Sequence, residues 1–298
     1  MVNDTSKISS AQPISKKEYN KRKFSLARLG CYIVLAILCF LCLFFFYMLL
    51  INSTHNNFQI QQGFLPLPGA SFMTNFNNLL LNANIPVLSG ICNSLIVSAC
   101  SAVLAIYFSA MCAYGIFAYD FKFKKVAFTL ILLIMTMPTQ ISAVGFVTEM
   151  QKIGLMNSLI PLFLPSIAAP VVVFFMKQYL DSNMQMEIVE AARIDGSGEF
   201  HTFNSIVIPI LKPALAVQAI FTFVTAWNNY FVPALLINSA KKKTLPILIA
   251  QLRSADFLRF DMGQVYMLIT IAIVPVIIIY LILSKYIVRG VALGGVKG

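Results

Sequence analysis

The residues of this chain that could do chemistry are few, and many of its carboxylates lie in one stretch. Residues 181–213 read DSNMQMEIVEAARIDGSGEFHTFNSIVIPILKP and lie between strongly apolar segments. Five of the chain's eleven acidic residues fall in the first part of this stretch: Asp181, Glu187, Glu190, Asp195 and Glu199. No serine–histidine–aspartate set and no paired carboxylates for acid–base work are indicated around them. We therefore expect no catalytic residue, and a surface that contacts another protein.

Local signals predict a short helix in this stretch. Ser182-x-x-Gln185 is a capping-box pattern, which predicts a helix that begins near Asn183. Gly196 is predicted to be the C′ residue that ends this helix, because glycine adopts the left-handed conformation required there.

The predicted helix has a face with little bulk. Residues three or four positions apart on this face are Ile188, Ala191, Ala192 and Asp195. A second short helix is predicted from about Glu199 to Ser205, and Pro209 then begins the next apolar segment at an N1-like position. A short helix with small side chains, on a loop between membrane spans, would fit into a cleft of another protein.

The sequence lacks the residues that a metal centre or a nucleotide-binding site would need. His55 and His201 are the two histidines and are predicted to be surface residues on opposite sides of the membrane, so no metal centre is expected. The cysteines show no paired spacing and are expected to be inert packing residues of the first two spans: Cys31, Cys39, Cys42, Cys92, Cys100 and Cys112. The sequence contains no Gly-x-x-x-x-Gly-Lys-Ser/Thr motif, so we expect no cofactor bound by this chain.

Composition places the chain in a membrane. Hydrophobic residues make up 59% of it and charged residues 11%, which excludes an ordinary soluble domain. The formal net charge of +11 could suggest nucleic acid as a partner. The basic residues cluster beside apolar segments, however, and anchoring to the cytosolic leaflet explains them better. We expect contact with the lipid bilayer and none with nucleic acid.

Apolar windows without charge define the predicted spans. Each is long enough for the ~20 residues that cross a bilayer. The windows are Leu29–Ile51, Val87–Tyr119, Val126–Thr148, Ile153–Met176, Pro213–Ala240 and Met262–Ser284. They predict an all-α integral membrane protein with six transmembrane helices, because a barrel would need short alternating segments. Residues 1–28 then form a basic arm, residues 29–290 the transmembrane domain and residues 291–298 a tail.

Basic residues orient the predicted spans. Residues 1–28 carry several lysines and arginines, whereas the loop of residues 52–86 carries none, so both termini are predicted to face the cytosol. Five basic residues oppose this orientation, because they would lie outside between spans five and six: Lys241, Lys242, Lys243, Arg253 and Arg259. Moving them inside would require two crossings within residues 213–240, which are too few.

Polar residues in or beside the spans are candidates for a solute pathway: Gln140, Trp227, Asn228, Asn229 and Tyr230. Pro138 frees a carbonyl near Gln140, which indicates either a bend that lines the pathway or a kink packed against neighbouring helices. The ring of Trp227 and the amides after it could bind a sugar, but an interfacial aromatic belt is favoured. No ionisable residue lies inside a span, which disfavours an ion-coupled carrier, although backbone carbonyls can bind sodium.

Residues 181–206 resemble the EAA loop of bacterial ABC importer permeases. The motif is Glu190-Ala191-Ala192, then Gly196, then Ile206-x-Ile208-Pro209; the family usually ends it in Leu-Pro, so Ile-Pro is a conservative departure. In that family this loop forms a cytosolic coupling helix, between helices four and five, that sits in a cleft of the ATP-hydrolysing subunit. The resemblance therefore implies these ATPase-coupling residues: Glu190, Ala191, Ala192, Asp195, Gly196, Ile206 and Pro209.

Other motifs resemble the same family. Asn93-Ser94-Leu95 and Ala113-Tyr114 resemble the permease core of ABC importers, Gly154-Leu155-x-Asn157 resembles the maltose-type permease pattern, and Thr244-Leu245-Pro246 resembles the family's outer loop. The C-terminal VALGGVKG resembles the second permease subunit of maltose-type carbohydrate importers. In that family the loop that corresponds to residues 244–246 meets the solute-binding protein, and the tail reaches towards the ATPase.

The resemblance implies a multi-pass transport subunit of the bacterial cytoplasmic membrane that is not an enzyme. Its expected partners are a second, different permease, an ABC ATPase dimer that binds ATP and Mg, and an extracytoplasmic sugar-binding protein. The expected solute is a sugar, specifically an oligosaccharide. The alternatives are another solute such as glycerol phosphate, or an ion-coupled secondary carrier. An anionic solute would favour a cationic lining, and none is visible inside the spans.

Overall fold

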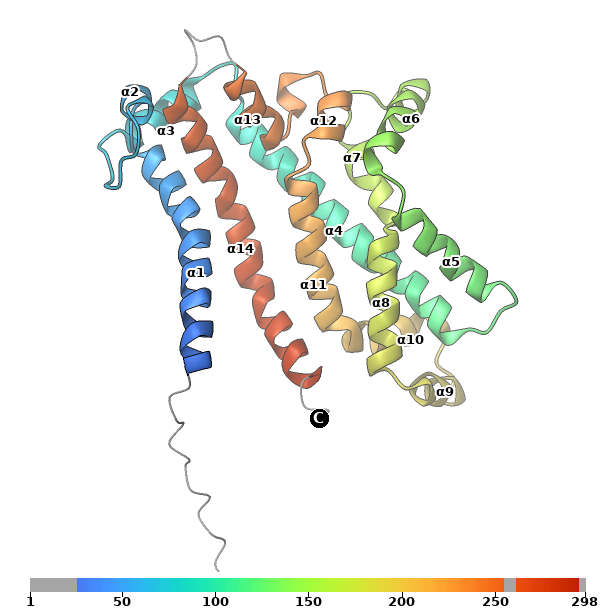
Figure 1. Ribbon diagram of the computed structural model, residues 1–298. Coiled ribbons are helices and arrows are strands. Elements are labelled where there is room, and N and C mark those ends of the chain that lie inside the picture. The colour runs from blue at the N-terminus through green and yellow to red at the C-terminus, as the bar shows by residue number, and fades with distance from the viewer. Residues whose placement is uncertain (1–25, 255–260, 295–298) are drawn as a thin grey trace, which may run out of the picture. The chain divides into compact units, whose positions relative to one another are not determined.

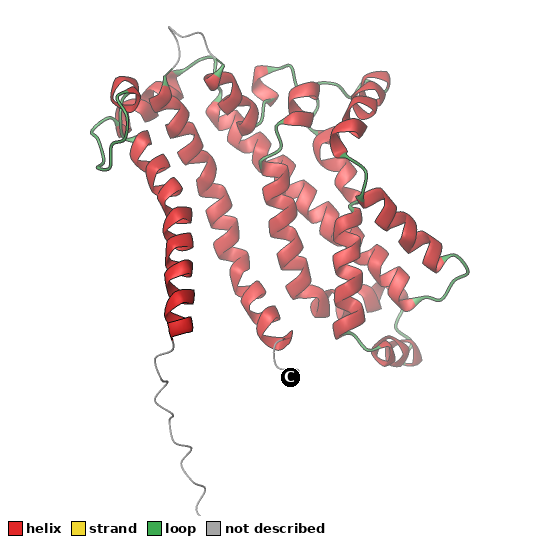
Figure 2. Ribbon diagram, in the orientation of Figure 1, coloured by secondary structure: helices red, strands yellow, loops and turns green. Residues whose placement is uncertain are grey.

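The computed structural model describes residues 26–254 and 261–294, and every element in these ranges is a helix (Figure 2). Most of the predicted basic arm, residue Arg259 and the last four residues of the predicted tail lie outside the described residues.

Five helical segments are long and apolar enough to cross a membrane. They contain α1 (Leu26–Ser53), α4 (Val87–Ala118), α7 (Ile160–Phe163) with α8 (Pro170–Asn183), α10 (Glu199–Thr202) with α11 (Ile208–Trp227), and α14 (Met262–Gly294). The shorter elements include α2 (Asn57–Gln61), α3 (Phe72–Leu81), α9 (Met186–Ile194), α12 (Phe231–Leu236) and α13 (Leu245–Arg253). The prediction of six spans is confirmed for five of them.

The third predicted span is not a single helix. Helices α5 (Lys124–Met135) and α6 (Thr139–Lys152) meet at an angle of 98°. Pro138 stands at the break and has no N–H to donate, so the helical hydrogen bonding of α5 does not continue into α6. The 12 residues of α5 cover about 18 Å, which is less than a hydrocarbon core of ~30 Å. The kink predicted at Pro138 is therefore a full break between two helices.

The fifth predicted span ends earlier than its apolar window. Helix α11 stops at Trp227, and residues 228–244 form α12 and a short 3-10 turn instead of continuing the span to Ala240. Asn157 holds this segment through its side-chain oxygen, which accepts hydrogen bonds from the backbone N–H groups of Asn238 and Ser239 at 3.3 and 3.0 Å. The Asn93 amide holds it from α4 by donating to the carbonyls of Lys241 and Lys243.

Helix α4 is the centre around which α8 and α11 pack (Figure 1). Its buried face consists largely of small residues, among them Ser98, Ser101, Ala102, Ala105, Ser109, Ala110 and Ala113. Small side chains let helix backbones approach closely, which stabilises helix packing in a membrane by van der Waals contact. The small side chains of α4 therefore allow α8 and α11 to pack closely against it.

Two predictions about single residues are wrong. His55 is buried, not at the surface, and its Nδ1 lies 3.0 Å from the carbonyl oxygen of Ile51. The buried Asn75 amide of α3 covers this turn by donating to the carbonyls of Ser53 and His55. The cysteines do not act as packing residues of this chain, because five are exposed on the outer surfaces of α1 and α4, and Cys100 is half-buried.

The closest helix contact can be tested at Gly90. A Cβ atom at this position of α4 would lie 2.5 Å from Cδ1 of the buried Leu248 on α13. We expect Gly90→Ala to lower the free energy of unfolding by about 1–3 kcal/mol, because the core must be overpacked. Thermal unfolding of the detergent-solubilised protein measures this change.

Gly115→Ala is the matched control, since it lies on the same helix with nothing within 4 Å of an added Cβ. It should be neutral or slightly stabilising. In a Leu248→Ala background, Gly90→Ala should cost less than in the unmodified chain. An equal cost in both backgrounds would contradict this account.

Candidate functional site

The short helix α9 lies between α8 and α10, at the end of the packed helices opposite to α12 and α13 (Figure 1). Its N-cap is Gln185, which makes no side-chain capping bond. The predicted capping box is wrong, because Ser182 still belongs to α8 and its hydroxyl donates to the Gln178 carbonyl at 2.9 Å. Helix α8 runs on to Asn183, so only two residues separate it from α9.

Gly196 ends α9 in the way the sequence predicts. Its φ is +78°, in the left-handed region that favours glycine. The Gly196 N–H donates to the Arg193 carbonyl at 3.1 Å, and the Ser197 N–H donates to the Ala192 carbonyl at 2.9 Å. This pair of bonds is a Schellman motif, which satisfies carbonyls at the helix end and fixes the direction in which the chain leaves α9.

Helix α9 has one buried and one exposed face. Val189 has no exposed surface and, together with Ala192, faces inward; Val189 packs in a core cluster with Leu180 of α8. The predicted small-residue face is therefore only partly right, since Ala192 is buried while Ile188, Ala191 and Asp195 are exposed. Two apolar side chains that no sequence pattern singled out are also exposed here: Ile194 on α9 is 86% exposed, and Phe200 on α10 is 69% exposed.

The second predicted helix does not end before Pro209. Helix α10 passes through a π-helical turn (Phe203–Val207) directly into α11. The π turn is wider than an α-helical turn and contains a hydrogen bond from the Ile208 N–H to the Phe203 carbonyl. It lets the helix continue past Pro209, which has no N–H.

The predicted coupling residues consequently separate into two groups. Glu190, Ala191, Ala192, Asp195 and Gly196 lie together on α9 or at its C-terminal end, whereas Ile206 and Pro209 lie further along, on the π turn and α11.

A polar cluster, here called the Glu199 cluster, joins α9 to α4. It consists of Arg193, Glu199, Tyr114 and Tyr119. The Arg193 Nε lies 2.7 Å from Glu199 Oε1, and the buried Tyr114 hydroxyl donates to Glu199 Oε2 at 2.8 Å. The Arg193 guanidinium also lies 5.2 Å from the centre of the Tyr119 ring. The sequence analysis did not identify this cluster; its one local signal is the pair of opposite charges on either side of Asp195-Gly196.

The Glu199 carboxylate contributes to a raised pKa in two neighbouring side chains. Its hydrogen bond raises the pKa of the Arg193 guanidinium above the usual range, so the ion pair stays charged. Desolvation, together with the nearby carboxylate, raises the pKa of Tyr119, which therefore stays neutral. Within the part of the chain that is described, no three His, Cys, Asp or Glu side chains are grouped so that they could hold a metal ion.

Trp227 supports neither of the two interpretations proposed from the sequence. It is 3% exposed, its ring stacks on Phe223 with centroids 5.7 Å apart, and its Nε1–H donates to the Ala272 carbonyl at 3.1 Å. A side chain buried between α11 and α14 does not lie in an interfacial belt, and in this structure it is covered by protein. The favoured interpretation as a belt residue is therefore wrong for Trp227.

Asn229 is the one predicted pathway residue that lines a described cavity. This cavity has a volume of about 470 Å³ and lies where the α5–α6 break meets α7, α8 and the start of α12. Besides Asn229 its lining is mainly apolar and includes Met135, Met137, Pro161, Pro165 and Pro170. Gln140, Asn228 and Tyr230 are exposed and are not among its lining residues.

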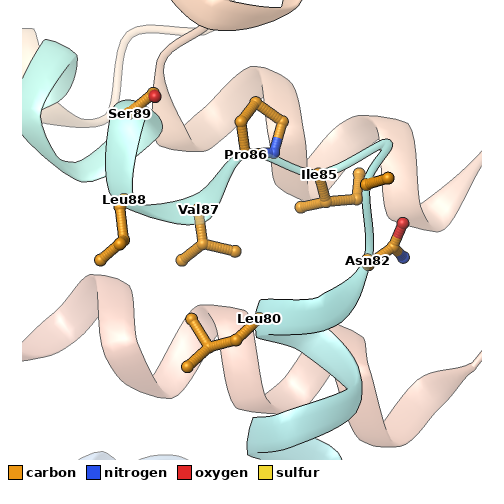
Figure 3. A pocket seen from close by; sticks show the side chains of 8 residues that line it. Leu80, Asn82, Ile85, Pro86, Val87, Leu88 and Ser89 are labelled. Carbon is orange, nitrogen blue, oxygen red and sulfur yellow. The ribbon is translucent and has the colours of Figure 1, made fainter.

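A second cavity, of about 400 Å³, lies between the end of α3 and the start of α4. Figure 3 shows Leu80, Val87 and Leu88 around it, with Asn82 at its margin. The Asn82 amide donates to Gln264 Oε1 at 3.2 Å, and no charged residue belongs to the lining. The cavity offers no group for chemistry.

The role of Gly196 in forming the end of α9 can be tested by substitution. Gly196→Ala should destabilise this end by about 1–2 kcal/mol, because an L side chain at φ +78° is strained. Amide hydrogen exchange over residues 186–200 should become severalfold faster. Gly198→Ser is the control, since Gly198 has φ −69° at an N-cap position, where serine is favoured. Equal exchange in both variants would contradict the assignment.

Comparison with known proteins identifies the family. Residues 105–293 match the family described as binding-protein-dependent transport system inner membrane component. The chain is 33% identical to the arabinooligosaccharides transport system permease protein AraQ of Bacillus subtilis (strain 168), over 93% of this chain and 98% of that protein. It is 32% identical to the melibiose/raffinose/stachyose import permease protein MelC of the same organism, over 69% of this chain and 75% of that protein.

A solved structure shares the fold. It is the crystal structure of a bacterial ABC transporter involved in the import of the acidic polysaccharide alginate. One of its chains superposes with a TM-score of 0.75 at 20% identity, over 88% of this chain and 98% of that chain. The match over residues 105–293, the apolar helices and the near full-length similarity to AraQ together assign the protein: it belongs to the family of multi-pass inner membrane components of binding-protein-dependent (ABC) transport systems.

Proposed function

We propose that the chain is one of two different permease subunits of an ATP-driven importer, and that its solute is an oligosaccharide. The observation that carries this proposal is the near full-length similarity to a permease named for arabinooligosaccharides. The relative named for melibiose, raffinose and stachyose supports the same solute class. The cavity beside Asn229 has no charged residue in its lining, which fits a neutral solute better than glycerol phosphate.

In this proposal α9 is the cytosolic coupling helix, and both chain termini also face the cytosol. Three features support the role of α9. Its exposed face offers Ala191 and Ile194 for apolar contact and Asp195 for polar contact. Its C-terminal end is fixed by the Schellman motif at Gly196. Its buried face is attached to the core through Val189. Such a helix can enter a cleft of an ATPase and move as a unit.

The energy for transport would come from partners. An ABC ATPase dimer would bind ATP and Mg, and its closure would move α9, so that the two permeases change from inward-open to outward-open. An extracytoplasmic binding protein would deliver the sugar near the α12–α13 end. Helix α4 has an exposed apolar face, with Leu88, Ile96 and Val103, that lipid or the second permease would cover.

The test is reconstitution of the chain with its co-purifying permease, ATPase and binding protein in proteoliposomes. Arabinooligosaccharides and raffinose-type sugars are then added one at a time. We expect at least one of these sugars to stimulate ATP hydrolysis and to accumulate inside only when ATP is present. Uptake driven by an ion gradient without nucleotide, or stimulation by glycerol phosphate alone, would contradict the proposal.

The exposed face of α9 can be probed with Ala191→Trp. A bulky ring at this exposed position should block docking in the ATPase cleft and reduce sugar-stimulated ATP hydrolysis and uptake at least tenfold, about 1.4 kcal/mol of docking free energy. Ser182→Trp, which is exposed at the end of α8, is the control and should remain active. Both variants should insert into the membrane. Full activity of Ala191→Trp would rule out docking through this face.

The adjacent amides provide a matched pair for the solute pathway. Asn229→Leu should raise the KM for the sugar, because a hydrogen-bonding group of the cavity is replaced by an apolar one of similar size. Asn228→Leu should change KM little, since Asn228 is exposed outside the cavity. Concentration dependence of uptake in proteoliposomes measures both values. A larger effect of Asn228→Leu would show that the solute does not use the cavity beside Asn229.

A further inference from the structure

We propose that the Glu199 carboxylate is a positioning group that fixes α9 to α4, and that it thereby determines how much of a movement of α9 reaches the membrane-spanning helices. This inference rests on the proposed role of α9 as the coupling helix. It assigns a transmission function to Tyr114, Arg193 and Glu199, which lie outside the exposed face of α9 that would meet an ATPase.

Three separate elements meet at this one carboxylate. Glu199 is the first residue of α10, which continues into α11. Arg193, in the last turn of α9, pairs with one carboxylate oxygen at 2.7 Å. Tyr114 of α4 donates to the other oxygen at 2.8 Å. Both oxygens are thus occupied, and each bond runs to a different element.

The chain connects α9 to its neighbours through two short segments. Two residues, Met184 and Gln185, separate it from α8, and the turn Asp195–Gly198 separates it from α10. The apolar contacts of Val189 hold α9 against the core, but such contacts have no preferred direction. Hydrogen bonds are directional, so the Glu199 cluster, together with the bond between the Ser197 and Thr202 hydroxyls at 2.8 Å, resists rotation or sliding of α9 along the core.

The link to Tyr114 should matter more than the ion pair. The Arg193 and Glu199 side chains are both partly exposed, and ion pairs of this kind contribute little. Tyr114 is 4% exposed, and its ring packs in the core cluster with Phe203, 5.7 Å away between ring centres. A hydrogen bond from a buried hydroxyl to a carboxylate is stronger than one between neutral groups. It also ties α10, and through Arg193 the end of α9, to α4, the helix on which α8 and α11 pack.

The experiment measures the number of sugar molecules transported per ATP hydrolysed by the complete reconstituted transporter. Tyr114→Phe keeps the ring and removes the hydroxyl, and Glu199→Gln removes the charge. We expect each variant to lower this ratio about threefold to tenfold, because Tyr114→Phe removes a hydrogen bond to a charged group and Glu199→Gln leaves one acceptor oxygen for two donors. ATP hydrolysis should continue, since the exposed face of α9 is unchanged.

Tyr107→Phe is the matched control. Tyr107 also lies on α4 and also donates from its hydroxyl across to the next element, here to Asn204 Oδ1 at 3.3 Å on the π turn. That bond does not involve α9, so this variant should keep the normal ratio. A loss of equal size in Tyr107→Phe would overturn the assignment to Glu199.

Exchanging the two charges tests whether the ion pair alone is sufficient or the link to α4 is also required. The triple variant Y114F/R193E/E199R restores an ion pair, and without the Tyr114 hydroxyl no hydrogen bond from residue 114 to residue 199 can form. We expect the ratio to stay low in this variant. Recovery of the normal ratio would show that the ion pair alone is sufficient and would overturn the role of Tyr114.

Three further outcomes test this inference and distinguish its failure from failure of the proposed function. An Ala191→Cys variant is cross-linked to the ATPase in the Tyr114→Phe and the unmodified backgrounds. Cross-linking in both, with an unchanged transport ratio in Tyr114→Phe, would overturn the inference and leave the coupling role intact. No cross-linking in either background would overturn the coupling role itself and the inference with it. A parallel loss of uptake and hydrolysis at constant ratio would show a merely structural role and would also overturn the inference.

Discussion

The close packing of α4 is the constraint on which the rest of the structure depends. Lipid tails are as apolar as the side chains, so helices in a membrane associate through close van der Waals contact. The alanine and serine face of α4 provides this contact for α8 and α11. Because α4 is also long, it holds elements at both ends of the packed helices: Asn93 and Ser94 bind the segment before α13 and its first residue, and Tyr114 donates to the carboxylate beside α9.

Polar groups lie mainly at the ends of the packed helices, for a physical reason. A charged or amide group facing lipid is costly, so such groups are found where protein or water can satisfy them. The Glu199 cluster is at one end, and Asn157 and Asn93 are at the other. The middle of the assembly is held by packing, and the ends are held by directional bonds. A permease needs this combination if its helices are to move together while its contacts with partners keep their geometry.

Two prolines, Pro138 and Pro209, stand at helix junctions and have different effects. At Pro138 the helix breaks, and the 98° turn contributes to a cavity that also includes Pro161, Pro165 and Pro170. At Pro209 the π turn before it lets the helix continue. The difference matters for function, because the first creates space beside Asn229, whereas the second makes α10 and α11 one continuous element. A displacement at Glu199 can therefore be passed directly along α11.

The sequence by itself determined the features that depend on local composition and conformation. Apolar length predicts the membrane class and five of the spans, the motif from Glu190 to Pro209 indicates the family, and Asp195-Gly196 predicts a left-handed helix end. Tertiary structure decided what depends on residues distant in the chain. Trp227 is buried because Ala272, 45 residues away, accepts its N–H, and Glu199 is held by Tyr114, 85 residues away. No local pattern encodes these pairings, because they arise only when α4, α11 and α14 pack together.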